Sequence, residues 1–175
     1  KEPFESYSDL LPNDSAWVAQ KPFKNKKKEL VNYTNCTALE NGWVWNVPLW
    51  SRIGTGYVYS SDFVSDEDAL KQFQKHLGTK ELEFRNIKSR VGIHKRLWVK
   101  NVVAIGLSAS FIEPLEGNGL FSVHEFLRIL LRNMKRGTVS QWDKDNFTHE
   151  CKSTFKCFAE FVAMHYALSH RNDTP

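Results

Sequence analysis

No stretch of this sequence is apolar enough to cross a membrane. A membrane-spanning helix needs about 18 to 20 mostly apolar residues in a row, and the chain has no such run. Its first residues, Lys1-Glu2-Pro3-Phe4, also lack the basic and then apolar pattern of a secretory signal peptide. We therefore expect a cytoplasmic protein with no membrane partner.

Cysteine is scarce, with only three in 175 residues. Cys36, Cys151 and Cys157 form no Cys-x-x-Cys pair, and so odd and sparse a set favours reduced thiols over a disulfide framework. His149 and His165 lie near two of these cysteines, but the spacing fits neither a zinc knuckle nor a His-x-x-x-His pair. The sequence therefore predicts no metal site.

A glycine-rich phosphate loop is also missing. A flavin or dinucleotide site holds the pyrophosphate on a Gly-x-Gly-x-x-Gly turn between a strand and a helix. The nearest string in this chain, Gly54-Thr55-Gly56, has no third glycine. These 175 residues therefore do not hold a complete nucleotide site of that type.

Strong charge of one sign is absent as well. The net charge is only +4, and the one basic run, Lys24-Asn25-Lys26-Lys27-Lys28, has no interleaved aromatic residues. That pattern is typical of a solvated loop and not of a nucleic-acid surface. Apolar residues make up 41% of the chain, which is ordinary for a globular domain with a real core.

The sequence pattern alternates between strands and helices. Residues 1–28 are rich in prolines and turn residues and are expected to form loops, whereas residues 29–64 are expected to form sheet. Asn41-Gly42 is a hairpin signal within that sheet. The expected strands are 31–37, 43–49, 53–60, 84–92 and 96–105, the last buried on both faces from Val102 onward.

Three helices are expected from capping signals and helical spacing. The first begins after Ser65, a typical N-cap, and stops at Gly78. The second runs from about Leu120 to Gly137, and the third occupies most of residues 143–172 with one apolar stripe. The chain is therefore predicted to be of the α/β class, with a mixed sheet and covering helices.

Residues 106–120 are the most informative segment. They read Gly-Leu-Ser-Ala-Ser-Phe-Ile-Glu-Pro-Leu-Glu-Gly-Asn-Gly-Leu and follow the apolar run Val102–Ile105. A strand, a loop with Gly106 and Pro114, and then a helix would direct backbone N–H groups and the positive end of a helix dipole at a bound anion. Glu116 places a carboxylate beside that site.

This segment resembles the second flavin-contacting motif of the flavin-dependent tryptophan halogenases. A second stretch, Trp43-Val44-Trp45-Asn46-Val47-Pro48, is similar to the family's Trp-x-Trp-x-Ile-Pro signature, with Val47 in place of isoleucine. The likeness runs over nearly the whole chain. It implies that residues 1–175 are the middle part of one longer domain with a flavin-monooxygenase-like, FAD/NAD(P)-binding fold, in which residues 84–136 contact flavin and halide.

The resemblance also assigns roles to individual residues. It implies flavin contacts by Gly106, Leu107, Ser108, Pro114 and Leu120, and halide contacts by the backbone of Asn118 and Gly119. The family usually has Ser-Thr or Ala-Thr where this chain has Gly117-Asn118, so a hydroxyl contact to the halide is lost while backbone donation is kept.

Glu116 matches the catalytic glutamate of the family. Its work would be to orient the halogenating species and to accept the proton lost from the aromatic ring. Glu113 is interpreted either as structural or as a residue that supports those contacting the ligands. Trp43 and Trp45 lie two residues apart, so their rings share one face of a strand. They are either plain core residues or, by resemblance and together with Pro48, the wall of a tunnel between flavin and substrate.

The implied activity is halogenation of an electron-rich aromatic compound such as tryptophan or another indole. It uses FADH2 from a separate flavin reductase, O2 and a halide, and it proceeds through hypohalous acid and a lysine outside this chain. The sequence leaves the substrate, the halide and a homo-oligomeric state open. Two alternatives also stay open, namely a flavin-dependent aromatic monooxygenase and a non-catalytic remnant that binds flavin or another ligand.

Overall fold

The computed structural model describes residues 2–135 and 137–171. The chain divides into two compact units. The first contains the described residues of Lys1–Pro12 together with Arg90–His170, and the second contains Asn13–Ser89 together with Arg171. Each unit is described by itself, and the prediction that the whole chain is part of one domain stays a prediction.

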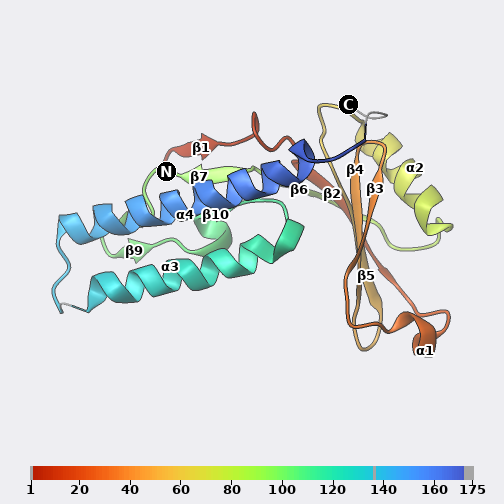
Figure 1. Ribbon diagram of the computed structural model, residues 1–175, viewed down its shortest axis with the longest axis horizontal. Helices are drawn as coiled ribbons and strands as arrows, with labels where there is room; N and C mark the ends of the chain where they lie inside the picture. The colour runs from red at the N-terminus through yellow and green to blue at the C-terminus, as the bar shows by residue number, and fades with distance from the viewer. Residues whose placement is uncertain (1, 136, 172–175) are drawn as a thin grey trace. The chain divides into compact units, whose positions relative to one another are not determined.

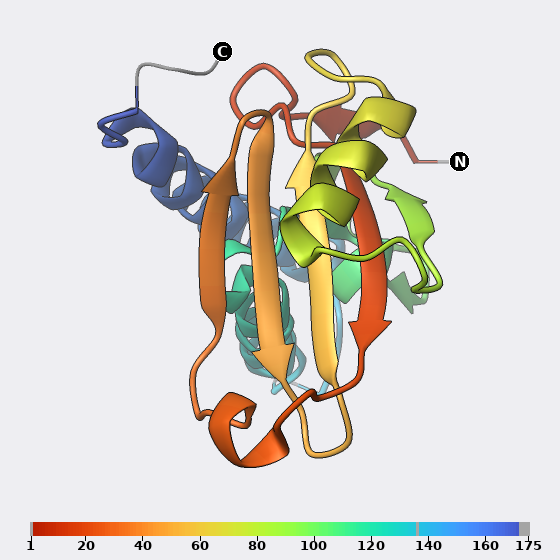
Figure 2. The ribbon, with the colours of Figure 1, turned by 90° about the vertical axis from the view of Figure 1, so that its right-hand side faces the viewer.

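The second unit is an antiparallel sheet with a helix on one face. Five strands lie in the order β3-β4-β5-β2-β6, and α2 lies across the sheet (Figure 2). The strands are β2 (Ser15–Lys21), β3 (Asn35–Leu39), β4 (Gly42–Pro48), β5 (Ile53–Tyr59) and β6 (Arg85–Lys88). The helices are the short α1 (Lys26–Glu29) and α2 (Asp66–Leu77).

Helix α2 has the limits that the sequence predicts. The Ser65 side chain accepts a hydrogen bond from the backbone N–H of Asp68, and Gly78 closes the other end in the left-handed conformation. Ala69 and Phe73 are fully buried on the inner face, where they pack in one cluster with Tyr57 of β5. The predicted hairpin also forms, because Leu39 of β3 pairs with Gly42 of β4 across a two-residue turn.

The first unit combines small sheets with two long helices (Figure 1). One sheet has the order β1-β7-β10, and β8 and β9 form a separate hairpin. The elements are β1 (Phe4–Ser6), β7 (Gly92–His94), β8 (Trp98–Val99), β9 (Val102–Val103), β10 (Ser110–Phe111), α3 (Asn118–Met134) and α4 (Gln141–Ala167). α3 and α4 lie against each other along their length (Figure 1).

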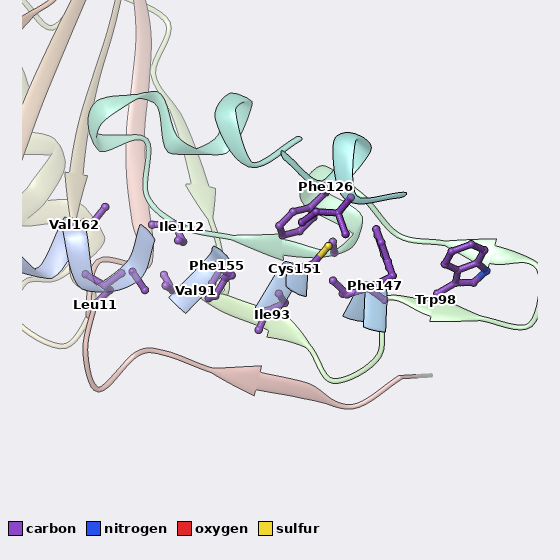
Figure 3. Close-up of a cluster of buried hydrophobic side chains, with 14 residues drawn as sticks. Leu11, Val91, Ile93, Trp98, Ile112, Phe126, Phe147, Cys151, Phe155 and Val162 are labelled. Atoms are coloured by element: carbon purple, nitrogen blue, oxygen red, sulfur yellow. The ribbon is translucent and has the colours of Figure 1, made fainter. Parts of the chain in front are cut away.

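The core of the first unit is built on the apolar stripe of α4. Phe147, Cys151, Phe155 and Val162 are all buried, and they pack with Phe126 of α3 (Figure 3). This stripe confirms the third predicted helix, which begins at Gln141, two residues before the predicted range. Ser140 caps it through a reciprocal pair of hydrogen bonds with Asp143.

Three sequence-based expectations about strands are wrong. Residues 1–28 are not loop throughout, because they contain β1 and the interior strand β2. The expected strand 84–92 is two strands, β6 and β7, which belong to different units. The expected strand 96–105 is the β8–β9 hairpin, which turns at Lys100 with a φ of 55°.

The burial expected for that last strand is also wrong, because Val102 is 65% exposed. Val102 begins the second strand of a hairpin that has only two strands, so unbroken hydrophobicity is not proof of a strand covered on both faces. The α/β class is confirmed. Every strand pair among residues 2–135 and 137–171 is antiparallel, so the parallel pairs of a mixed sheet are not found in this described part.

Candidate functional site

The segment from Gly106 to Gly117 is a compact loop with an unusual backbone. Gly106–Ser108 and Leu115–Gly117 each form one turn of 3-10 helix, and β10 lies between them. Gly106 and Gly117 have positive φ angles of 64° and 69°. Glu116 is also left-handed, with a φ of 59°, a conformation that side-chain-bearing residues seldom adopt. Such strain is often found at functional sites.

Helix α3 begins directly after this loop without a side-chain cap. Its N-cap residue is Gly117, which has no side chain to accept hydrogen bonds from the first turn. The other two long helices differ in this respect, since Ser65 caps α2 and Ser140 caps α4. The first N–H groups of a helix have no acceptor within the helix, so this end of α3 can receive an anion.

A cavity of about 370 Å³ lies beside the uncapped end of α3. Its lining is largely apolar, and several positions contribute backbone because they are glycines. The lining residues are Gly106, Leu107, Ser110, Phe111, Ile112, Pro114, Gly117, Asn118, Gly119, Leu120, Ser122, Val123 and Phe155. Leu107 and Leu120 are 83% and 70% exposed, so two large apolar side chains present surface to water here.

Most of the residues predicted to contact flavin or halide lie in this cavity lining. They are Gly106, Leu107, Pro114, Asn118, Gly119 and Leu120. Ser108 is not among them, and its hydroxyl donates to the carbonyl of Ile105 at 2.8 Å within the loop. The sequence reasoning missed Ser122 and Val123, although both lie four residues after a predicted halide residue, on the helical spacing that returns to the same face.

The side chain of Asn118 is used inside the protein. It is only 6% exposed, and its Nδ2 donates a hydrogen bond to the carbonyl of Leu115 at 2.8 Å. Ser122 likewise donates to the carbonyl of Gly119 at 2.9 Å. These two bonds fix the first turn of α3, so the groups that Asn118 and Gly119 can offer to a ligand are backbone N–H groups.

Glu116 lies next to the cavity lining and faces a histidine of α4. Its side chain is 58% exposed, and its Oε1 is 3.8 Å from Nε2 of His165. The other ring nitrogen of His165, Nδ1, is 2.9 Å from the carbonyl oxygen of Phe161. The Phe161 and His165 rings meet edge to face at 4.7 Å between centroids. His165 was not predicted as a site residue from the sequence.

The second carboxylate of the loop, Glu113, has a different environment. It is only 1% exposed, and it accepts a hydrogen bond from the hydroxyl of Tyr166. A buried carboxylate held by a tyrosine suits the structural role predicted for it. Glu113 and Glu116 therefore face two adjacent residues of α4, Tyr166 and His165.

Trp43 and Trp45 belong to the second unit, where both project from one face of β4. Trp45 lies against β5, because a Cβ atom added at Gly56 would come within 2.5 Å of its Cζ2. Trp43 is 8% exposed, and its indole Nε1 is buried with no hydrogen-bond partner among the described residues. Their role as a tunnel wall stays a prediction.

Pro48 does not share the face of the two tryptophans. Along β4 it alternates with them and lies on the side of Val44, which packs under α2. There it lines a separate cavity of about 290 Å³ together with Lys21 and His76. The predicted trio of tunnel residues is thus a pair of tryptophans on one face and a proline on the other.

The described residues show neither a metal centre nor a membrane span. No cluster of three or more histidine, cysteine or acidic side chains suited to a metal ion occurs among them. Within that same part of the chain, no helix has the length and apolar character needed to span a bilayer.

Comparison with known proteins gives a consistent result. The family model described as tryptophan halogenase matches residues 1–175. The tryptophan 6-halogenase SttH of Streptomyces toxytricini is 38% identical over 98% of this chain and 33% of its own length. The tryptophan 7-halogenase RebH of Lentzea aerocolonigenes is 36% identical over 100% of this chain and 33% of its own.

Solved structures agree with these sequence matches. The apo structure of VirX1 superimposes with a TM-score of 0.94 at 47% identity, covering 99% of this chain and 34% of that one. The crystal structure of SttH gives a TM-score of 0.92 over the same shares. The chain therefore spans about a third of the length of the relatives it matches.

Proposed function

The chain belongs to the tryptophan halogenase family, and from that premise we propose that the complete protein is a flavin-dependent halogenase acting on tryptophan or a related indole. One observation carries the proposal. The loop Gly106–Gly117 brings an apolar cavity, an uncapped helix N-terminus and an exposed glutamate together in one unit. These are the three features that a flavin, a halide and a proton transfer require.

The cavity suits one edge of a flavin. Gly106 and Gly117 present backbone without side chains, so a flat ring could approach closely. The exposed side chains of Leu107 and Leu120 offer apolar surface that a ring system would cover. Pro114 stiffens the wall between them. Ser108 would contact the cofactor through its backbone, since its hydroxyl is engaged with Ile105.

The start of α3 suits the halide. A desolvated halide ion needs several N–H donors, and the uncapped first turn at Asn118 and Gly119 supplies them. Because the donors are backbone groups, the replacement of the family's usual Ser-Thr or Ala-Thr by Gly117-Asn118 leaves them in place. The absence of a hydroxyl at these two positions leaves more room for bromide or iodide.

When bound, reduced flavin supplies, with dioxygen, the oxidation that converts halide to hypohalous acid. Glu116 accepts the proton that the aromatic ring loses when halogen has bound to carbon. Trp43 and Trp45 line the path of the small hypohalous acid and keep the substrate from the flavin. The reduced flavin comes from a separate reductase, and the catalytic lysine lies in the remainder of the protein.

The proposal is tested with the complete protein that contains this chain. It is incubated with a flavin reductase, FAD, NADH, O2, bromide and tryptophan or indole, and the products are analysed by mass spectrometry. A halogenase gives a product with the isotope doublet of bromine. Oxygen addition that does not depend on bromide would instead identify an aromatic monooxygenase, and no turnover with any indole would identify a non-catalytic remnant.

The role of Glu116 is tested with a matched pair of variants. Glu116→Gln removes the proton acceptor and should reduce kcat about a hundredfold or more. Glu160→Gln is the control, because this glutamate on α4 has the same 58% side-chain exposure and forms an exposed ion pair with Lys156. Full bromination by Glu116→Gln would show that the assignment is wrong.

A further inference from the structure

The pairing of Glu116 with His165 has a consequence for proton transfer. His165 lies near the end of α4, and its side chain is 33% exposed. Its two ring nitrogens have different neighbours. Nδ1 is 2.9 Å from the carbonyl oxygen of Phe161, one helical turn earlier, whereas Nε2 faces Oε1 of Glu116 at 3.8 Å.

The neighbour of Nδ1 decides where the hydrogen of a neutral imidazole resides. A carbonyl oxygen can only accept a hydrogen bond, so Nδ1 of His165 must carry the hydrogen and donate it. Nε2 is then left with a lone pair, and it faces a carboxylate oxygen that is itself an acceptor. A separation of 3.8 Å is longer than an N–H···O hydrogen bond, as expected for two acceptors with no proton between them.

We propose, building on the halogenase function above, that His165 is the next acceptor of the proton that Glu116 receives. The C–H bond of the halogenated ring carbon breaks, its electron pair returns to the aromatic ring, and the proton binds the Glu116 carboxylate. The new O–H group then donates to Nε2 of His165. Transfer of the proton gives an imidazolium and restores the carboxylate, and the imidazolium, whose side chain is 33% exposed, then releases a proton to water.

The main alternative is that His165 only stabilises the helix. Its hydrogen bond to Phe161 and the edge-to-face contact of the two rings would both serve that purpose. The two roles use different ring nitrogens, so they can be separated. A structural role needs the Nδ1 side alone, whereas the proposed role needs Nε2.

The first test reads the tautomer of His165 without any catalysis. Nitrogen-15 NMR of the complete protein, at a pH where the imidazole is neutral, should show Nδ1 protonated and Nε2 bare. That is the less common tautomer of histidine in water, so the result would not arise by default. A protonated Nε2 would overturn the inference, and it would do so whether or not the protein halogenates.

The second test measures bromination by single and double variants. Asn at position 165 keeps an amide N–H near the Nδ1 position but has no atom at Nε2. We expect His165→Asn to lower kcat about tenfold or more, with the KM values for bromide and substrate unchanged. In a Glu116→Gln background the same change should cause no further loss, because His165 acts through Glu116.

His149→Asn is the matched control, since His149 is an exposed histidine of the same helix. It should leave kcat at the wild-type value. Wild-type activity in His165→Asn, or an equal loss in both backgrounds, would overturn the inference while leaving the halogenase proposal intact. An inactive wild-type protein would instead remove the halogenase proposal, and the NMR result would still decide the tautomer and its pairing.

Discussion

The hydroxyl of Tyr166 donates a hydrogen bond to the buried carboxylate of Glu113. The adjacent residue on α4, His165, faces Glu116. Two neighbouring positions near the end of one helix thus hold the two carboxylates of the candidate site, which are three residues apart. The conformation of the loop that carries Glu116 therefore depends on how the last turns of α4 are packed.

We predict that Tyr166→Phe destabilises the first unit by about 1 to 3 kcal/mol. The reason is that the buried carboxylate of Glu113 loses a hydrogen-bond donor. The measurement is urea denaturation followed by circular dichroism. Tyr33→Phe, at a tyrosine that is 60% exposed, is the control and should unfold like the wild type. Equal midpoints for both variants would contradict the prediction.

A second prediction concerns the position of the Trp45 ring. Gly56→Ala places a Cβ atom 2.5 Å from Cζ2 of Trp45, so the ring must move, and we expect a loss of about 1 to 3 kcal/mol. Gly54→Ala is the matched control, since its Cβ would lie 3.7 Å from the same ring. Tryptophan fluorescence and thermal unfolding of both variants would show the difference. A normal spectrum for Gly56→Ala would mean that the ring does not lie against β5.

The third prediction separates backbone strain from steric contact in the candidate site. Gly106 and Gly117 have similar positive φ angles, so alanine should cost about 1 kcal/mol at either position. At Gly106 the new Cβ would also lie 3.2 Å from Val123 Cγ2, whereas at Gly117 nothing lies within 4 Å. Gly106→Ala should therefore be the less stable variant in thermal unfolding. A larger loss at Gly117 would contradict this.

The fourth prediction concerns pH. A hydrogen bond from the Lys88 ammonium, supported by one from the Tyr59 hydroxyl, holds the pKa of the Asp66 carboxyl below its usual range. A lowered pKa in the folded state stabilises the fold above the unfolded pKa of about 3.9, and the gain is lost as pH falls through the folded value.

Asp66→Asn should consequently be less stable than the wild type at neutral pH, and the difference should vanish in acid. We expect a gap below about 1 kcal/mol, because the pair with Lys88 is well exposed. Denaturant titrations of both proteins from pH 7 to pH 2 would measure this difference in unfolding free energy. That pH range includes the ordinary aspartate pKa of about 3.9. A stability difference that widens as the pH falls would contradict the prediction.

The fifth prediction concerns thiol reactivity. Burial raises the pKa of the Cys151 thiol to about 12, so almost no thiolate is present at neutral pH. Cys36 and Cys157 are exposed. Alkylation followed by peptide mass spectrometry should label these two first, and Cys151 only after unfolding. Rapid labelling of Cys151 in the folded protein would mean that the α4 core is more open than described.

The sequence predicted best those elements whose limits are set by local chemistry. Ser65 and Gly78 define α2 through a cap and a left-handed stop, both of which can be read from residue type. The candidate site was predicted mainly through resemblance, and the structure brings most of its residues to one cavity. The side-chain bond of Asn118 could not be foreseen, since it depends on where the chain turns at Leu115.

The predictions that failed concern strands that are defined by pairing with residues far away in the sequence. Ser15–Lys21 looks like a loop because turn residues surround it, yet it forms interior strand β2 by pairing with β5 and β6. Such partners are far away in the sequence, and strand preference depends heavily on them. His165 was missed for a related reason, because its role depends on facing Glu116 from an element 49 positions away.

Because α3 has no side-chain cap, the stability of the first unit should depend on the anions in solution. Any anion that binds the open first turn adds its binding free energy to the folded state and none to the unfolded state. The melting temperature of this unit would then rise with the concentration of the ion that fits best, and a series of sodium halides at equal ionic strength would rank the ions. The helix left open at Gly117 would thus report, through thermal unfolding alone, which of these anions it binds most tightly.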